Sequence, residues 1–125
     1  MRSRMSTYLG QLPAALQNVI KTVNKRTSAG NQSSSIQTTQ DKLFLLSEIE
    51  IFGATTYSFA GEGTQYEYYA AGNTTIKKVN GSAYTWWERS PISDNTTYFC
   101  AVNSSGIADY NGASNSRGVS FGFCV

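Results

Sequence analysis

The sequence contains no histidine, only two cysteines and few charged residues, and each shortage excludes a class of function. Histidine and clustered cysteines are the usual zinc ligands, and histidine is also the commonest general base, so we expect no metal site. A formal net charge of +2 with 14% charged residues gives no electrostatic footprint for nucleic acid. No apolar run approaches the roughly 18 residues of a membrane span. The sequence therefore predicts no cofactor, no nucleic-acid partner and no membrane partner.

The motifs of common enzymes are also missing. No nucleophile motif is present, and the Gly-Glu-Gly segment at residues 61–63 lacks the lysine and the serine or threonine of a phosphate-binding loop. Glu48 and Glu50 could be mistaken for a catalytic pair. However, Ser47 and Glu50 have the spacing of a capping box, and we expect Glu48 to face solvent. We therefore predict that the protein is not an enzyme.

The residues that dominate the chain are serine, threonine, asparagine and glycine, over a length of 125 residues. This length suits one domain with a single core, and we expect residues 1–125 to form it. A further interpretation is that they are the C-terminal part of a longer protein. The composition is typical of secreted, surface or virion proteins, and the N-terminus shows no signal peptide. We therefore expect a virion, extracellular or cell-surface location.

The N-terminal third contains one strong helical pattern. Residues 12–23 place Leu16, Val19, Ile20 and Val23 on one face at helical spacing, and Pro13 suits a first helical turn. We expect this helix to pack on the sheet of the same domain. A Ser/Thr/Gln/Asn-rich stretch follows at residues 27–40, and it favours either a long loop or an irregular hairpin.

The middle of the chain alternates short apolar runs with turns. Residues 43–46 predict a buried strand, and the capping box predicts a single helical turn ending at Gly53. Residues 54–85 carry many tyrosines among glycines. These rings could stack on sugars or bases, but irregular loops fixed by half-buried tyrosines explain them equally well.

The last forty residues predict strands joined by polar turns. Trp86 and Trp87 are adjacent in a strand and therefore point to opposite faces, and Arg89 needs loop carbonyls or Glu50 as hydrogen-bond acceptors. Residues 98–102 and 107–110 predict a hairpin around the turn at residues 103–106.

The chain then ends in a strand with Val119, Phe121, Phe123 and Val125 on one face. We expect an antiparallel meander whose Val119, Phe121 and Phe123 pack against the N-terminal helix. The two cysteines, Cys100 and Cys124, each lie in a predicted strand. Two buried thiols and a disulfide between neighbouring strands both fit this placement.

These C-terminal motifs carry a resemblance. The Trp-Trp-x-Arg-Ser-Pro segment from Trp86, the Tyr-Phe-Cys hairpin and the terminal Gly-Val-x-x-x-Phe segment resemble a family of uncharacterised bacterial and phage proteins. Its members usually have leucine where this chain has Glu88, and Arg-Pro-Ala where it has residues 120–122. That family resembles the C-type-lectin-like fold of formylglycine-generating enzymes and of the variable proteins of diversity-generating retroelements. The resemblance implies an α+β fold in which one main N-terminal helix packs on a small twisted antiparallel sheet with long irregular loops.

The resemblance also implies a binding function. In the variable proteins, the segment before the terminal strand displays changeable residues, and residues 92–116 of this chain contain only residue types that adenine changes in asparagine codons can produce. Such a domain would serve a phage tail or virion, or a bacterial surface, in host recognition. Eight residues on or beside turns are the candidate ligand-binding set: Asn95, Thr96, Tyr98, Asn103, Asp109, Tyr110, Asn111 and Asn115.

The expected partner is a bacterial cell-surface protein or glycan, with other tail or virion proteins and a second copy of the chain as further candidates. The neighbours Phe99, Cys100, Val102 and Ile107 are expected to belong to the core. An alternative function is a structural virion or surface-assembly module without an external ligand.

Overall fold

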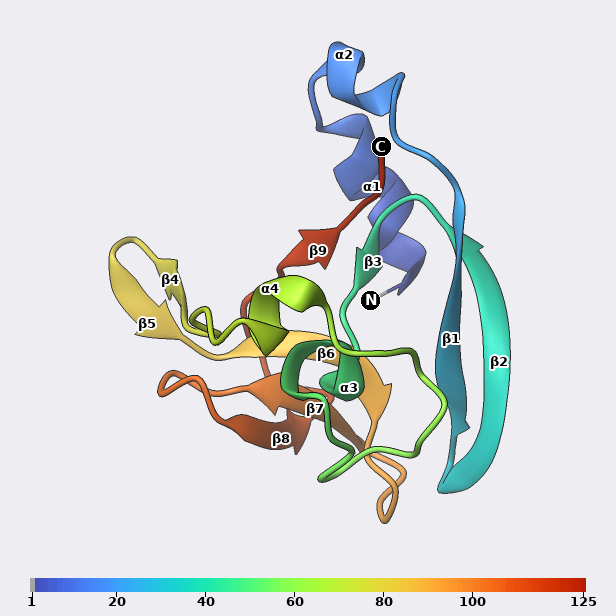
Figure 1. The fold of residues 1–125 in the computed structure, drawn as a ribbon, viewed down its shortest axis with the longest axis vertical. Helices are drawn as coiled ribbons and strands as arrows, with labels where there is room; N and C mark the ends of the chain where they lie inside the picture. The colour runs from blue at the N-terminus through green and yellow to red at the C-terminus, as the bar shows by residue number, and fades with distance from the viewer. Residues whose placement is uncertain (1) are drawn as a thin grey trace.

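A computed structural model describes residues 2–125, which form short helices and small antiparallel sheets around a three-stranded meander (Figure 1). The helices are the 3-10 helix Arg2–Arg4 and α1 (Met5–Gly10), α2 (Ala14–Gln17), α3 (Glu48–Phe52) and α4 (Glu67–Ala70). The strands are β1 (Val23–Gly30), β2 (Ser33–Asp41), β3 (Phe44–Leu45), β4 (Lys77–Val79), β5 (Ser82–Tyr84), β6 (Trp86–Pro91), β7 (Tyr98–Val102), β8 (Ala108–Gly112) and β9 (Phe121–Gly122). The mixed helical and antiparallel-strand class predicted from the sequence is confirmed at this level.

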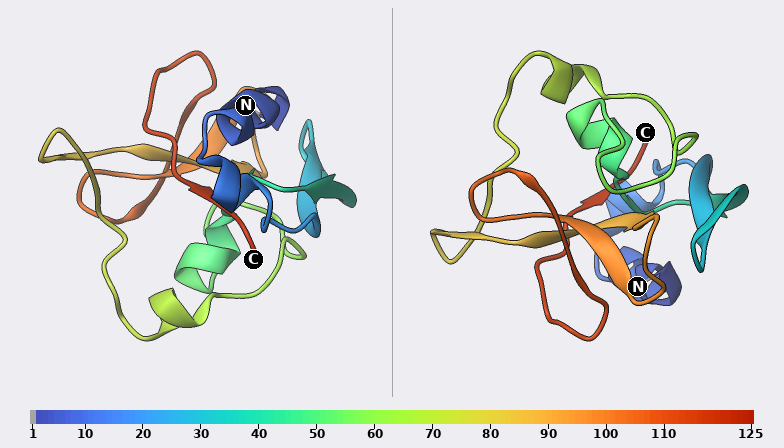
Figure 2. Two further views of the ribbon diagram at one scale, coloured as in Figure 1. Left: turned by 90° about the horizontal axis from the view of Figure 1, so that it is seen from above. Right: turned by 90° about the horizontal axis from the view of Figure 1, so that it is seen from below.

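The sheet pairings follow the chain closely. β6, β7 and β8 form the meander, β1 pairs with β2, and β4 pairs with β5. Only β3 and β9, at 44–45 and 121–122, join distant parts of the chain. Figure 2 shows the hairpin β1–β2 and the hairpin β4–β5 on opposite sides of the meander. No helix within residues 2–125 is long and apolar enough to cross a bilayer.

The predicted helix over residues 12–23 is wrong. Only Ala14–Gln17 is α-helical, Val19 is 53% exposed, and Val23 begins β1 opposite Asp41. β-branched residues such as Val19, Ile20 and Val23 lose side-chain freedom in a helix and suit extended backbone. Pairing with β2 therefore outweighs a periodicity that fits a helix. Ile20 is still buried and belongs to the core.

Of the two interpretations of residues 27–40, the hairpin is right. β1 and β2 pair from Val23 opposite Asp41 to Gly30 opposite Ser33, with a register shift between Ser28 and Gly30. Asn31 and Gln32 both have positive φ, as the favoured two-residue hairpin turn requires. The short buried strand predicted at residues 43–46 is also present, as β3.

The core consists of two hydrophobic clusters on the two sides of β6. Trp87 packs in the first cluster and Trp86 in the second, with exposed fractions of 8% and 2%. The first cluster also contains Met5, Ile20, Leu43, Leu45 and Ala101, and the second contains Ile51 and Val102. The prediction that the adjacent tryptophans point to opposite faces is confirmed.

The C-terminal segment differs from its predicted arrangement. β9 contains only Phe121–Gly122 and pairs with β3, outside the meander. Val119, Phe123 and Val125 are 36%, 39% and 67% exposed, so their predicted core positions are wrong. Phe121 is half-buried, contacts the first cluster and stacks on Tyr8 with ring centroids 6.0 Å apart. A two-residue strand cannot bury alternate residues over the whole segment.

Two other positions assigned to the core are exposed, and the two cysteines differ. Phe99 is 36% exposed and Ile107 is 61% exposed because Ile107 lies in the turn between β7 and β8. Cys100 is fully buried in β7, as predicted. Cys124 is an exposed free thiol, because it forms only an isolated bridge to Lys21 near the chain end. Cys100 and Cys124 are not joined by a disulfide.

Candidate functional site

The scaffold of the candidate site begins at α3. Ser47 Oγ accepts a hydrogen bond from the Glu50 amide at 3.3 Å, and the Ser47 amide donates to Glu50 Oε2 at 3.0 Å. This confirms the predicted capping box. Gly53 ends the helix in the left-handed conformation at φ 69°, where glycine meets no Cβ clash with its own backbone. A side chain directed from α3 is therefore held in a defined place.

Glu48 on α3 was expected in solvent, and this expectation is wrong because Glu48 is fully buried. Its Oε1 accepts hydrogen bonds from the Tyr57 and Ser58 amides at 3.0 Å each and from Ser58 Oγ at 2.7 Å. The Tyr57 carbonyl in turn accepts from the Ser93 amide at 2.8 Å. A buried carboxylate with three donors is well satisfied, and here it fixes the loop that carries Tyr57.

Tyr57 belongs to a group of three rings, which we call the tyrosine cluster: Tyr57, Tyr98 and Tyr110. The Tyr57 and Tyr110 rings meet edge to face with centroids 5.0 Å apart, and the Tyr98 and Tyr110 rings stack at 5.6 Å. Tyr98 and Tyr110 are 38% and 41% exposed. Such ring contacts hold the side chains in place while leaving apolar and hydroxyl surface open to a partner.

The structure brings together only part of the predicted ligand-binding set. Cys100 pairs with Tyr110 and Tyr98 with Gly112, so both tyrosines project from the same face of the hairpin. Asp109 and Asn111 flank Tyr110 in β8 and therefore point to the opposite face. The other four residues lie outside β7 and β8: Asn95 and Thr96 in the loop before β7, Asn103 in the turn between the strands, and Asn115 after β8.

Three of the predicted asparagines also shape the backbone. In each case the side-chain oxygen accepts hydrogen bonds from residues nearby in the sequence: Asn95 from the Thr97 amide and hydroxyl at 2.8 Å, Asn103 from the Ser105 and Ile107 amides at 2.9 and 3.0 Å, and Asn111 from Arg117 Nη2 at 2.7 Å. Asparagine commonly stabilises turns in this way. The oxygen atoms of these side chains thus hold loops in position, and Tyr98, Tyr110, Thr96 and Asn115 present the exposed surface.

Sequence reasoning did not place Tyr57 and Glu48 at this site. Tyr57 is one of many tyrosines in residues 54–85, and its sequence distance from Tyr110 gives no sign that the rings touch. A glutamate at the start of a helix normally interacts with solvent and the helix dipole. Only the return of the loop over α3 buries Glu48.

A second buried polar network supports the scaffold. Arg89 donates to Glu50 Oε2 at 2.6 Å, and Lys25 donates to Glu50 Oε1 at 2.5 Å. Glu50 was one of the two expected partners of Arg89, and the carbonyl acceptors come from Arg26, Leu45 and Glu62 rather than from the following loop. Burial alone raises the pKa of Glu50, but the hydrogen bonds and charge of Arg89 and the hydrogen bond from Lys25 lower it overall.

Glu88 has no comparable compensation. It is 2% exposed, and its two carboxyl oxygens lack any hydrogen-bond partner among the described residues. Burial, followed by the nearby Glu48 and Glu62 carboxylates, raises the pKa of Glu88 well above its usual range. The neutral acid is therefore favoured over the carboxylate. Burial also raises the pKa of Cys100, with Glu88 as the next cause.

Comparisons with known proteins place the chain in a family. Within residues 2–125, no group of three or more histidine, cysteine, aspartate or glutamate side chains could hold a metal ion. No curated protein and no solved structure matches the chain. A family model described as "Domain of unknown function (DUF6273)" matches residues 3–125, and the chain therefore belongs to this family.

Proposed function

We propose that the protein is a non-enzymatic binding domain that recognises a surface ligand through the tyrosine cluster and the adjoining loops of residues 92–116. The observation that carries the proposal is the contact of three partly exposed rings from two distant segments, with Tyr57 fixed by the buried Glu48. Tyrosine provides large contact area for little loss of side-chain freedom, which suits recognition.

The proposal includes the C-type-lectin-like fold and the host-recognition role implied by the sequence resemblance. The loops on either side of β7 and after β8 carry exposed polar residues such as Thr96 and Asn115, and substitutions there leave the strand ladder intact. A surface of this kind can change its specificity while the scaffold stays the same. The ligand is a bacterial cell-surface protein or glycan, and the site of action is a virion, a phage tail or a cell surface.

A specific observation favours the alternative of an assembly module. Val19, Phe123 and Val125 are exposed, and the bridge between Lys21 and Cys124 brings their two segments side by side. Apolar surface of this kind suits contact with a neighbouring subunit or a second copy of the chain. This function would leave the tyrosine cluster without a role in binding.

Binding of the fluorescently labelled domain to a panel of bacterial cells and to a glycan array tests the proposal. Tyr110→Ala should weaken binding about thirtyfold, the effect of losing a central tyrosine worth about 2 kcal/mol. Tyr84→Ala is the matched control, because Tyr84 is 42% exposed but lies outside the tyrosine cluster. Equal binding by the two variants, or no binding by the unmodified domain together with self-association lost on Val125→Asp, would favour the assembly module.

A further inference from the structure

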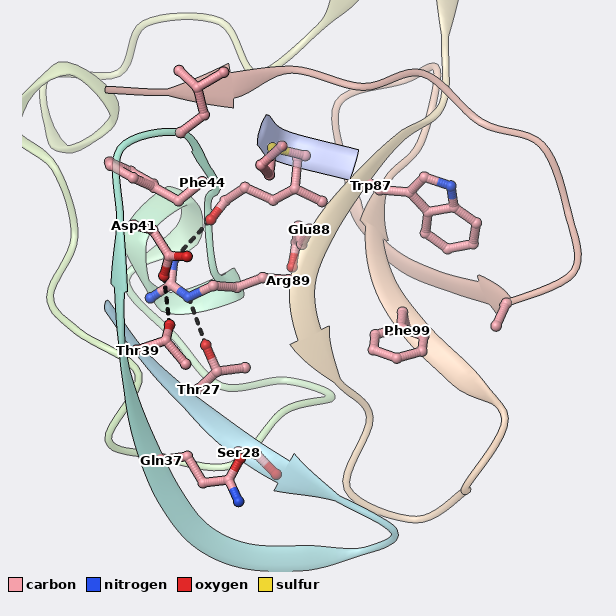
Figure 3. A pocket seen from close by; sticks show the side chains of 14 residues that line it. Thr27, Ser28, Gln37, Thr39, Asp41, Phe44, Trp87, Glu88, Arg89 and Phe99 are labelled. Carbon is pink, nitrogen blue, oxygen red and sulfur yellow. Dashed lines mark hydrogen bonds between the residues drawn. The ribbon is translucent and has the colours of Figure 1, made fainter. Parts of the chain in front are cut away.

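A cavity of about 430 Å³ lies between the hairpin β1–β2 and strands β3 and β6 (Figure 3). Its volume falls within the usual range of small-molecule sites, which is about 300–1,000 Å³. Phe99 of β7 lines it, and alternate residues of a strand point to opposite faces, so it lies on the other face from Tyr98. The cavity is therefore separate from the tyrosine cluster, and an inference about it does not depend on the proposed function.

The cavity has two chemically different walls. Apolar and aromatic side chains form one wall: Met5, Leu43, Phe44, Leu45, Trp87 and Phe99. Hydroxyl, amide and carboxylate side chains of the hairpin form the other: Thr27, Ser28, Gln37, Thr39 and Asp41. In Figure 3 the side chains of Gln37 and Thr39 lie on the hairpin side, and Phe99 lies on the far side of β6. A ligand that fits both walls needs one apolar face and one edge rich in hydrogen-bonding groups.

The charges around the cavity indicate a ligand without net negative charge. Arg89 is the cationic side chain among the lining residues, and its donors are already used by Glu50, by Thr27 and by three carbonyl groups. A guanidinium whose donors are used in this way offers little to a carboxylate or phosphate. Asp41 on the rim repels anions further.

We propose that this cavity binds a neutral pyranose sugar, either free or at the end of a glycan. A pyranose ring has an apolar face of C–H groups that packs on aromatic rings, and its hydroxyl groups project from the ring edge. Phe99 and Phe44 would contact the apolar face, and Gln37 and Thr39 would hydrogen-bond the hydroxyls. A few polar groups opposite an apolar wall are the usual design of a small-molecule site.

The hairpin supplies a matched pair of positions for testing this proposal. Gln37 and Thr38 are neighbours in β2, and both are exposed. Gln37 lines the cavity, whereas Thr38 does not and points to the other face of the hairpin. Both replacements by alanine remove one exposed polar side chain from the same strand, so they share any effect on hairpin stability.

The experiment is an NMR titration of the isotope-labelled domain with the methyl glycosides of glucose, galactose, mannose and N-acetylglucosamine at millimolar concentration. At least one glycoside should shift the amide signals of the lining residues in β2, β3 and β6. Gln37→Ala should weaken that sugar's binding about tenfold, as expected for the loss of a good hydrogen bond, while Thr38→Ala and Tyr110→Ala should leave it unchanged. Phe99→Ala should weaken it similarly, with the sugar-free spectrum of each variant serving as the folding check.

Other outcomes overturn the proposal. They are an absence of shifts at the cavity with all four glycosides, equal weakening by Gln37→Ala and Thr38→Ala, or equally tight binding of the anionic sugar N-acetylneuraminic acid. Shifts confined to the tyrosine cluster also overturn it and would assign sugar binding to the other surface. If the cavity binds, a glycan ending in the same sugar then separates the two sources: tighter binding than the methyl glycoside indicates a glycan end, and equal binding indicates the free sugar.

Discussion

Glu88 shows at the scale of one residue how a core position can carry a charge-bearing side chain. The carboxyl group is buried without a hydrogen-bond partner among the described residues, next to Glu48, Glu62 and Cys100. The related proteins suggested by sequence resemblance have leucine here, which would need no partner. A buried polar group without a partner typically costs about 1–3 kcal/mol, so this residue lowers the stability of the fold.

We predict that Glu88→Leu raises the free energy of unfolding by about 1–3 kcal/mol at neutral pH. The pKa of Glu88 is raised in the folded state, so the unfolded chain binds fewer protons once the pH exceeds the ordinary value of 4.5. Stability of the unmodified protein therefore falls as the pH rises from that value toward the raised pKa, and the variant lacks this part of the slope. Urea denaturation at pH 5 and pH 8 measures both, with a larger gain expected at pH 8.

Glu67→Leu is the control for this substitution because Glu67 is exposed on α4. It should change the free energy of unfolding by less than about 0.5 kcal/mol. A destabilised Glu88→Leu variant would show that the carboxyl group has a partner in solution, such as an ordered water.

Glu50 is the opposite case, because its carboxylate is compensated by two cations. We predict that Glu50→Ala lowers the free energy of unfolding by about 3–5 kcal/mol, since Lys25 and Arg89 would remain buried without their counter-charge. Because the pKa of Glu50 is lowered, its stabilising contribution is present above the ordinary value of 4.5 and is lost as the pH falls through the folded pKa.

Denaturant titrations at pH 7 and pH 3 check the Glu50 prediction. The difference between the unmodified protein and Glu50→Ala should shrink at pH 3. The exposed Asp94 supplies the comparison, and Asp94→Ala should have little effect at either pH. An unchanged difference at pH 3 would mean that the ion pairs do not account for the loss.

At the scale of elements, the pairing of β9 with β3 determines which C-terminal side chains are structural. Phe121 lies opposite Leu45 and contacts the first hydrophobic cluster, whereas Phe123 lies two residues beyond it and is exposed. We predict that Phe121→Ala lowers the free energy of unfolding by about 1–3 kcal/mol, less than for a fully buried phenylalanine, and that Phe123→Ala changes it by less than about 0.5 kcal/mol. Thermal and urea denaturation of the two variants give the comparison, and equal losses would place both rings in the core.

The N-terminal region shows the same competition between local pattern and pairing. The periodicity of Leu16, Val19 and Ile20 suits a helix, but the chain leaves α2 after Gln17 and enters β1. The partner strand β2 provides backbone hydrogen bonds that a short helix end would leave to water. Pairing therefore decided the conformation of a segment whose pattern alone was ambiguous.

At the scale of the whole molecule, the two cysteines report on two levels of opening. Cys100 lies in the central strand β7 with no exposed surface, and Cys124 is exposed at the chain end. We predict that Cys124 reacts with an alkylating reagent within the time expected of an exposed thiol. Cys100 should react only when the domain unfolds globally, because burial also raises the pKa of its thiol and disfavours the reactive thiolate.

Mass spectrometry of the protein after timed alkylation distinguishes the two thiols. The rate at Cys100 should increase with urea in proportion to the unfolded population, while the rate at Cys124 stays nearly constant. Cys124→Ser isolates the Cys100 signal. Fast labelling of Cys100 in that variant without urea would show that β7 opens locally.

The sequence by itself determined the features that depend on neighbours in the chain. These include the capping box of Ser47 and Glu50, the opposite faces of Trp86 and Trp87 and the β7–β8 hairpin, because turn chemistry and side-chain alternation act within a few residues. They also include the partnership of Arg89 with Glu50, since a buried guanidinium needs an anion.

Only the tertiary structure decided which segments meet. The contact of Tyr57 with Tyr110, the burial of Glu48 and Glu88, and the pairing of β3 with β9 all join residues that are distant in the sequence. It also determined that Phe123 and Cys124 stay exposed, although their spacing suits a buried strand. The physical reason is that burial depends on which surfaces pack together, and a periodic pattern specifies a face without specifying what covers it.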